Sequence, residues 1–327
     1  MAVYRLEEAE LGAFIAALAK RYEVFAPVRT DAVRFQQVQD GQAIDLTENS
    51  YVPPKGFFFA KGEPLFLFDG AKLAMPLEFV EPRVFFGVRR CDLNAINHQD
   101  MVYMEEGRDP YYARRREATL LIGYHCSTPP NRYCFCGSMK LKDCQDLMLV
   151  QRPGYFLVDV GSEGGGRLIN EFPAFFRETD EALRDEDRVT PGADGLATTD
   201  IAALYGDRRW EEEVQNCLSC AACTTLCPTC YCYEINDDVE LGHPERGTRN
   251  RCWSSCQLKE FTRVAGDVCT RSSRSERFRH RIYHQIEYFR ERYNVTLCTG
   301  CGRCISYCPT RIDWVGAVNR MVAGGKQ

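Results

Sequence analysis

The chain has 327 residues, of which 45% are hydrophobic, and a formal net charge of -5. This length suffices for two or three domains with cores of their own, and so mild a charge gives no reason to expect nucleic acid or an anionic membrane as a partner. The longest apolar runs, VFFGV and TLLIGY, are far shorter than a bilayer span, and the amino terminus lacks the features of a signal peptide. We therefore expect a soluble, cytoplasmic protein.

Residues 1–192 have the pattern of an α/β domain. Leu11, Phe14, Ile15, Leu18 and Tyr22 share one face at helical spacing and predict an opening amphipathic helix. Short apolar runs at 57–59, 65–68, 84–88, 119–124 and 155–160 predict strands with buried faces. A helix over 93–104, which we expect to begin after an N-cap at residue 92, would complete a βαβ unit with two parallel strands.

Four cysteines fall near the ends of those two strands. Cys91 and Cys126 follow the strands directly, and parallel strands place their carboxyl ends at one edge of the sheet, where α/β proteins bind ligands. Cys134 and Cys136 lie on the loop just beyond. The four thiolates could hold a [4Fe-4S] cluster, but their spacing is not diagnostic, and buried free cysteines are common core residues. Both interpretations stay open.

The pattern changes after residue 192. A polar stretch predicts a linker over 193–209, and residues 210–327 predict a mainly α-helical, ferredoxin-like domain. Ser273 and Glu276 form a possible capping box for one helix of this domain. The apolar face of that helix would consist of Phe278, Ile282, Ile286, Phe289 and Tyr293. Its many arginines favour a solvated face or a subunit-docking surface over a nucleic-acid interface.

One cysteine pattern occurs twice in this second part. It reads Cys217-x2-Cys220-x2-Cys223-x3-Cys227-Pro228 and again Cys298-x2-Cys301-x2-Cys304-x3-Cys308-Pro309. Three thiolates at i, i+3 and i+6 can bind one [4Fe-4S] cluster, while the fourth, before the proline, binds the neighbouring cluster. We therefore predict two clusters, the first held by Cys217, Cys220, Cys223 and Cys308, and the second by Cys298, Cys301, Cys304 and Cys227.

Zinc and disulfides are the alternatives for these eight residues. Structural zinc takes two ligand pairs separated by a dozen or more residues, and disulfides need an oxidising compartment. Neither matches this pattern. The remaining cysteines are Cys144, Cys230, Cys232, Cys252, Cys256 and Cys269. We interpret Cys230 and Cys232 as packing residues and place Cys256 on a helix covering the clusters; a fourth cluster has no support from spacing.

Motifs for substrate chemistry are missing. The chain has no dinucleotide-binding glycine pattern, no phosphate-binding loop, no nucleophile elbow and no H-E-x-x-H pair. We accordingly predict no catalytic residue. The sequence indicates a carrier of electrons whose substrate chemistry takes place on another chain.

The cysteine motifs stand within a longer series of recognisable runs. The series FGVRRCDLNAINHQD, DPYYARRREATLLIG, CFCGSM, CPTCYCY, WSSC and CTGCGRCISYCP resembles the iron-sulfur β subunit of soluble NiFe sulfhydrogenases. It is also similar to the A subunit of anaerobic sulfite reductase. The resemblance covers most of the chain from about residue 84 onward, whereas the first eighty residues match loosely.

The resemblance implies a role within a hetero-oligomeric complex. Such a subunit relays single electrons between a flavin subunit that handles NAD(P)H and a catalytic partner, which is a NiFe hydrogenase pair or a sirohaem sulfite reductase. The closing CTGCGRCISYCPTRID run favours the hydrogenase. Two other classes of function stay open: a self-contained flavin-dependent oxidoreductase, and a regulatory module in which clusters sense the redox state.

Overall fold

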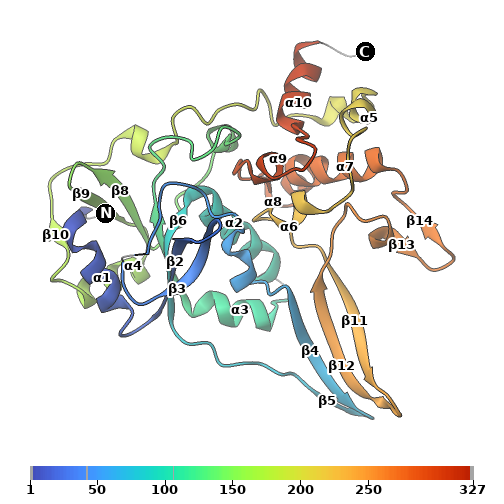
Figure 1. The fold of residues 1–327 in the computed structure, drawn as a ribbon, viewed down its shortest axis with the longest axis horizontal. Helices are drawn as coiled ribbons and strands as arrows, with labels where there is room; N and C mark the ends of the chain where they lie inside the picture. The colour runs from blue at the N-terminus through green and yellow to red at the C-terminus, as the bar shows by residue number, and fades with distance from the viewer. Residues whose placement is uncertain (1–2, 42, 106, 325–327) are drawn as a thin grey trace.

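The computed structural model describes residues 3–41, 43–105 and 107–324. A mixed sheet of eight strands, in the order β10-β1-β9-β8-β7-β6-β2-β3, organises the N-terminal half (Figure 1). Its strands are β1 (Val3–Glu7), β2 (Glu23–Arg29), β3 (Val33–Val38), β6 (Arg83–Arg89), β7 (Thr119–Tyr124), β8 (Leu147–Arg152), β9 (Tyr155–Val160) and β10 (Arg177–Glu178). The four central strands, β2, β6, β7 and β8, run parallel, and antiparallel strands flank them on both sides.

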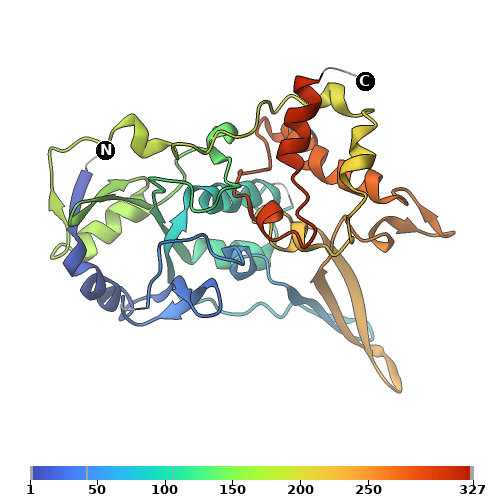
Figure 2. The same cartoon turned by 45° about the horizontal axis from the view of Figure 1, so that its top comes forward.

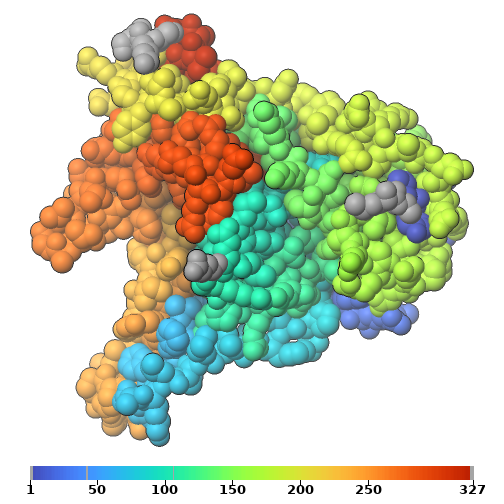
Figure 3. All heavy atoms as spheres, turned by 180° about the vertical axis from the view of Figure 1, so that it is seen from behind, coloured from blue at the N-terminus to red at the C-terminus, as the bar shows by residue number. Residues whose placement is uncertain are grey.

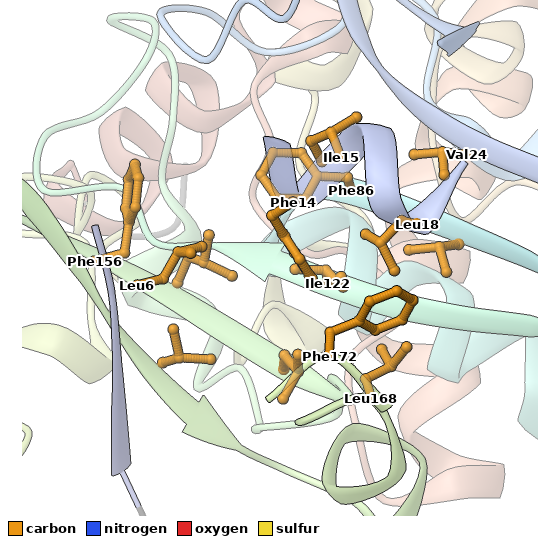
Figure 4. Close-up of a cluster of buried hydrophobic side chains, with 14 of the residues drawn as sticks. Leu6, Phe14, Ile15, Leu18, Val24, Phe86, Ile122, Phe156, Leu168 and Phe172 are labelled. Atoms are coloured by element: carbon orange, nitrogen blue, oxygen red, sulfur yellow. The ribbon is translucent and has the colours of Figure 1, made fainter. Parts of the chain in front are cut away.

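Helices cover both faces of this sheet. One face packs against α1 (Leu11–Leu18) and α4 (Glu163–Glu171), and the other packs against α2 (Arg90–Tyr103) and α3 (Pro110–Glu117). Successive residues of one strand point to opposite faces, so Phe86 lies in the first core and Phe85 in the second. In Figure 4, Phe14 and Leu18 of α1 lie among side chains from the strands and from α4. Burying each such side chain contributes about 1.5–3 kcal/mol.

The C-terminal half contains several short helices around a core of its own. They are α5 (Arg209–Glu213), α6 (Ala222–Thr225), α7 (Arg274–Tyr283), α8 (Phe289–Tyr293), α9 (Arg303–Ser306) and α10 (Trp314–Ala323). A π-helical turn over His284–Tyr288 joins α7 to α8, so that the two form one continuous helix. Trp210, Phe278 and Trp314 lie in this core, and so do Phe135 and Met139 from the N-terminal half. In Figure 2, α5 and α10 lie beside each other at the end of the molecule remote from the large sheet.

A second sheet connects the two halves. It has the order β11-β12-β4-β5 and consists of β4 (Gly62–Asp69), β5 (Lys72–Ala74), β11 (Tyr233–Glu240) and β12 (His243–Trp253). Strand β4 therefore belongs to the N-terminal half by sequence but pairs with β12 of the C-terminal half. This sheet projects from the body as an arm, which the view from behind also shows (Figure 3). The two-residue strands β13 (Arg263–Val264) and β14 (Val268–Cys269) form a smaller hairpin.

Several sequence predictions are confirmed. Strands occupy 65–68, 84–88, 119–124 and 155–160, and β6, α2 and β7 form the expected parallel βαβ unit. The capping box at Ser273 is present, with Glu276 as its second member. No helix within the described ranges is long and apolar enough to cross a membrane.

Other predictions are wrong. Residues 57–59 form no strand. A 3-10 turn at Pro54–Phe57 precedes the buried Phe58 and Phe59. A short apolar run alone does not distinguish a buried strand from a buried turn. Helix α2 begins at Arg90, so Asp92 lies in its first turn and is not its N-cap. The prediction of a mainly helical C-terminal domain holds only in part, because the segment between the cysteine motifs begins with the strands β11 and β12. Cys256 does not lie on a helix but in a turn after β12.

Candidate metal centres

The two cysteine motifs fold into loops of the same shape. The second and fourth residues after the first cysteine have positive φ in both loops, at Ser219, Ala221, Gly300 and Gly302. In each loop the amide of the second residue donates to the sulfur of the first cysteine, at 3.4 Å for Ser219 to Cys217 and 3.4 Å for Gly300 to Cys298. A short helix, α6 or α9, then follows at the same position of each motif. The internal repeat of the sequence is therefore also a repeat of backbone geometry.

The Cys-Pro-Thr ends of the motifs repeat as well. The sulfur of Cys227 lies 3.2 Å from the hydroxyl of Thr229, and the sulfur of Cys308 lies 3.5 Å from that of Thr310. The amide of Ile312 adds a hydrogen bond of 3.4 Å to Cys308. Donors of this kind stabilise negative charge on a ligated sulfur and thereby tune the potential of a cluster.

The eight motif cysteines border two cavities. The first cavity is lined by five of them, Cys217, Cys220, Cys223, Cys304 and Cys308. The second is lined by Cys227, Cys298, Cys301 and Cys304. Each cavity thus receives the cysteine before proline from the opposite motif. Each contains one of the two predicted ligand sets, and the first also contains Cys304 of the second set. Four cysteine thiols are the donor set that a [4Fe-4S] cluster requires.

A single metal ion fits this arrangement less well. Among the described residues, no three histidine, cysteine or acidic side chains lie close enough together to hold one ion. Thiols that surround a cluster of four irons necessarily stand farther apart than thiols around one zinc ion. Four cysteines within eleven positions, followed by proline, are the sequence pattern of a [4Fe-4S] cluster rather than of structural zinc.

The structure also brings the third predicted set together. Cys91 lies in the first turn of α2, Cys126 follows β7, and Cys134 and Cys136 lie on the loop beyond. Burial, with smaller contributions from the nearby Cys136 and Cys126, raises the pKa of Cys134 to about 12. Burial likewise raises the pKa of Cys91, to which Cys136 also contributes. The four thiols are thus electrostatic neighbours at the carboxyl edge of the parallel strands.

The third set adjoins the second. The sulfur of Cys134 lies 3.8 Å from the carbonyl oxygen of Cys301, and the amide of Phe135 donates to the carbonyl of Gly300 at 2.8 Å. A Cβ at Gly300 would lie 2.5 Å from the backbone nitrogen of Cys136. The close approach requires glycine there, whereas in the first motif Ser219 adopts the same positive φ.

A buried ion pair holds these elements in place. Arg303, directly after Gly302, donates through two nitrogens to the carboxylate of Asp92 at 2.7 Å and 2.7 Å, and both side chains are at most 1% exposed. The same guanidinium donates to the carbonyl of Ser50 at 2.7 Å. The second motif is thereby tied to the helix that carries Cys91. Sequence analysis missed this pair because no local pattern links residues 211 positions apart.

Comparison with known proteins agrees with this geometry. Residues 216–312 match the family of 4Fe-4S dicluster domains, so the C-terminal part carries a ferredoxin-like 4Fe-4S domain. No solved structure matches the chain significantly. Over 319 residues the chain is 34% identical to the sulfhydrogenase 2 subunit beta of Pyrococcus furiosus, a match that covers 92% of this chain and 92% of that protein. The chain therefore belongs to the family of sulfhydrogenase beta subunits, which are iron-sulfur proteins of the 4Fe-4S dicluster type.

Proposed function

We propose that this protein is the electron-transfer subunit of a hydrogenase complex and binds one [4Fe-4S] cluster at each of the three thiol sets. The observation that carries the proposal is the pair of cavities, one bordered by five motif thiols and the other by four, and each drawn from both motifs. When bound, each cluster accepts and releases one electron at a time. The protein supplies the thiolates, the burial and the hydrogen bonds that set the potentials.

The three sets form a continuous series. Cys304 borders both cavities of the dicluster part, so the first and second sets are neighbours. Cys301 of the second set lies next to Cys134 of the third. Electrons could therefore pass from the carboxyl edge of the large sheet, through the second set, to the first.

The first set offers an exit to the surface. Cys220 is exposed, and the neighbouring Leu218, which also borders the first cavity, is 65% exposed. An apolar side chain beside a cluster near the surface suits contact with a partner subunit. We propose that one redox partner docks there.

The partners follow from the chemistry that this chain lacks. A one-electron relay must exchange electrons with a flavin, which splits the electron pair of NAD(P)H, and with a catalytic subunit. The curated relative is named as the beta subunit of a sulfhydrogenase. We therefore propose a flavin-containing subunit and a NiFe catalytic pair as partners, with no catalytic residue on this chain.

Iron analysis and co-purification test the proposal. The chain, purified anaerobically, should contain about eight irons from the first two sets and about four more from the third, with broad visible absorption that dithionite bleaches. The native complex should contain flavin and nickel on other chains. Iron well below eight atoms per chain, or flavin bound to the isolated chain, would contradict this function.

A further inference from the structure

Arg281 borders both cavities of the dicluster part. This residue lies on α7, in the segment between the two motifs, and is 3% exposed. Among the described residues that border the two cavities, none is acidic, and Arg281 alone is basic. A single buried positive charge therefore faces both the first set and the second set.

The guanidinium of Arg281 has few partners in the protein. Its Nη2 donates to the carbonyl of Cys223 at 2.7 Å, but its Nε is buried and has no acceptor within the described residues. Arg277, one turn earlier on the same helix, is also buried, yet its Nε donates to the carbonyl of Gln257 at 2.9 Å and its Nη1 to that of Ser272 at 2.6 Å. Buried donors nearly always have an acceptor, so the unpartnered Nε of Arg281 requires an explanation.

No carboxylate compensates the charge of Arg281. Two other buried arginines have one, because Arg303 pairs with Asp92 and Arg251 with Glu63, and each of these side chains is at most 5% exposed. Within the described ranges, no ion pair of this kind includes Arg281. A buried cation is costly unless an anion compensates it. The surroundings of Arg281 therefore fit an anion in the two cavities that it borders.

Iron-sulfur clusters are anions of the required kind. A [4Fe-4S] cluster with four thiolate ligands is negatively charged in both of its redox states, and the electron that it accepts on reduction makes it more negative. A fixed cation nearby stabilises the reduced form more than the oxidised form, and burial limits the screening of this attraction by solvent and salt. A buried guanidinium beside a cluster therefore raises the reduction potential of that cluster.

We propose that Arg281 is the shared counter-cation of the first two clusters and raises the reduction potential of both. The inference rests on the proposed function, because it presupposes clusters in the first and second sets. Arg281 binds no iron in this role. Because its charge acts on both clusters in the same direction, it shifts the two potentials together rather than changing the difference between them. Arginine stays protonated in proteins, so this effect does not depend on pH.

Redox titration of the anaerobically purified full-length chain, followed by paramagnetic resonance, tests the inference. Arg281→Gln removes the charge and should lower the reduced-to-oxidised ratio of two clusters by about tenfold or more at a fixed solution potential, a shift of about 59 mV per tenfold. Arg281→Lys keeps the charge and should stay near the wild-type potentials. Arg279→Gln is the matched control: Arg279 lies on the same helix, donates to the carbonyl of Tyr205 and borders neither cavity, so its loss should leave the potentials unchanged.

The outcomes separate this inference from the proposed function. Potentials that stay unchanged in Arg281→Gln, a shift confined to one cluster, or an equal shift in Arg279→Gln or Arg281→Lys overturns the inference and leaves the proposed function intact. A wild type without clusters overturns both. If Arg281→Gln does not assemble both clusters, Arg281→Lys decides: two clusters at wild-type potentials support the shared counter-cation, whereas missing clusters or lowered potentials overturn it.

Discussion

Substitution of Arg303 by methionine should destabilise the protein strongly. The change preserves most of the side-chain volume but leaves the carboxylate of Asp92, which is 1% exposed, without its cation. Breaking a buried ion pair by removing one partner costs about 3–5 kcal/mol, since the remaining charge is buried and unpaired. With a urea m-value of about 3 kcal/mol/M, the unfolding midpoint should fall by about 1–1.7 M.

Anaerobic urea titration, followed by tryptophan fluorescence and cluster absorption at matched iron content, measures this shift. The double variant Asp92→Asn, Arg303→Met should recover much of the loss, because it removes both charges. Arg320→Met is the surface control: its ion pair with Glu213 is 61% and 22% exposed, and exposed pairs contribute about 0–1 kcal/mol. An equal midpoint for Arg303→Met and Arg320→Met would refute the reasoning.

Three more predictions concern the clusters. Cys91→Ala and Cys136→Ala should each remove about four irons per chain and one paramagnetic signal, whereas unchanged iron would assign those thiols to packing. Gly300→Ala should lower the free energy of unfolding by more than about 1–2 kcal/mol, the cost of a left-handed residue alone. Ser219→Ala, at the same position of the first loop, should change this free energy little. Thr310→Val removes a hydroxyl 3.5 Å from Cys308 and should lower one reduction potential by on the order of 20–60 mV, the equivalent of one hydrogen bond. An unchanged potential in a redox titration would show that this hydroxyl does not donate to a ligated sulfur.

Local patterns explain what the sequence predicts well. The parallel strands around α2 follow from apolar runs separated by a helical period, and the spacing of the motif cysteines anticipates which thiols meet at each cavity. These features depend on neighbours within a few dozen residues or on a pattern with a known geometry.

Contacts between distant residues explain what it misses. Strand β4 pairs with β12, although about half of the chain separates them. Apolar and polar residues do not alternate regularly along either strand, because much of the arm is exposed to solvent. Lys55 has no feature in sequence that distinguishes it from a surface lysine, and only the fold places it under Cys230. Pairings of this kind require the tertiary structure.

The pairing of β4 with β12 bears on whether the dicluster part can exist alone. A fragment that begins at residue 210 would keep β12 and β11 but lose β4, and one edge of β12 would expose a row of unpaired backbone groups that promotes aggregation. The same fragment would lack Phe135, whose ring packs against Trp314 with centroids 5.4 Å apart. The ferredoxin-like portion is therefore not a detachable module, and a minimal electron carrier made from this protein would have to retain the strand and the loop that the first half contributes.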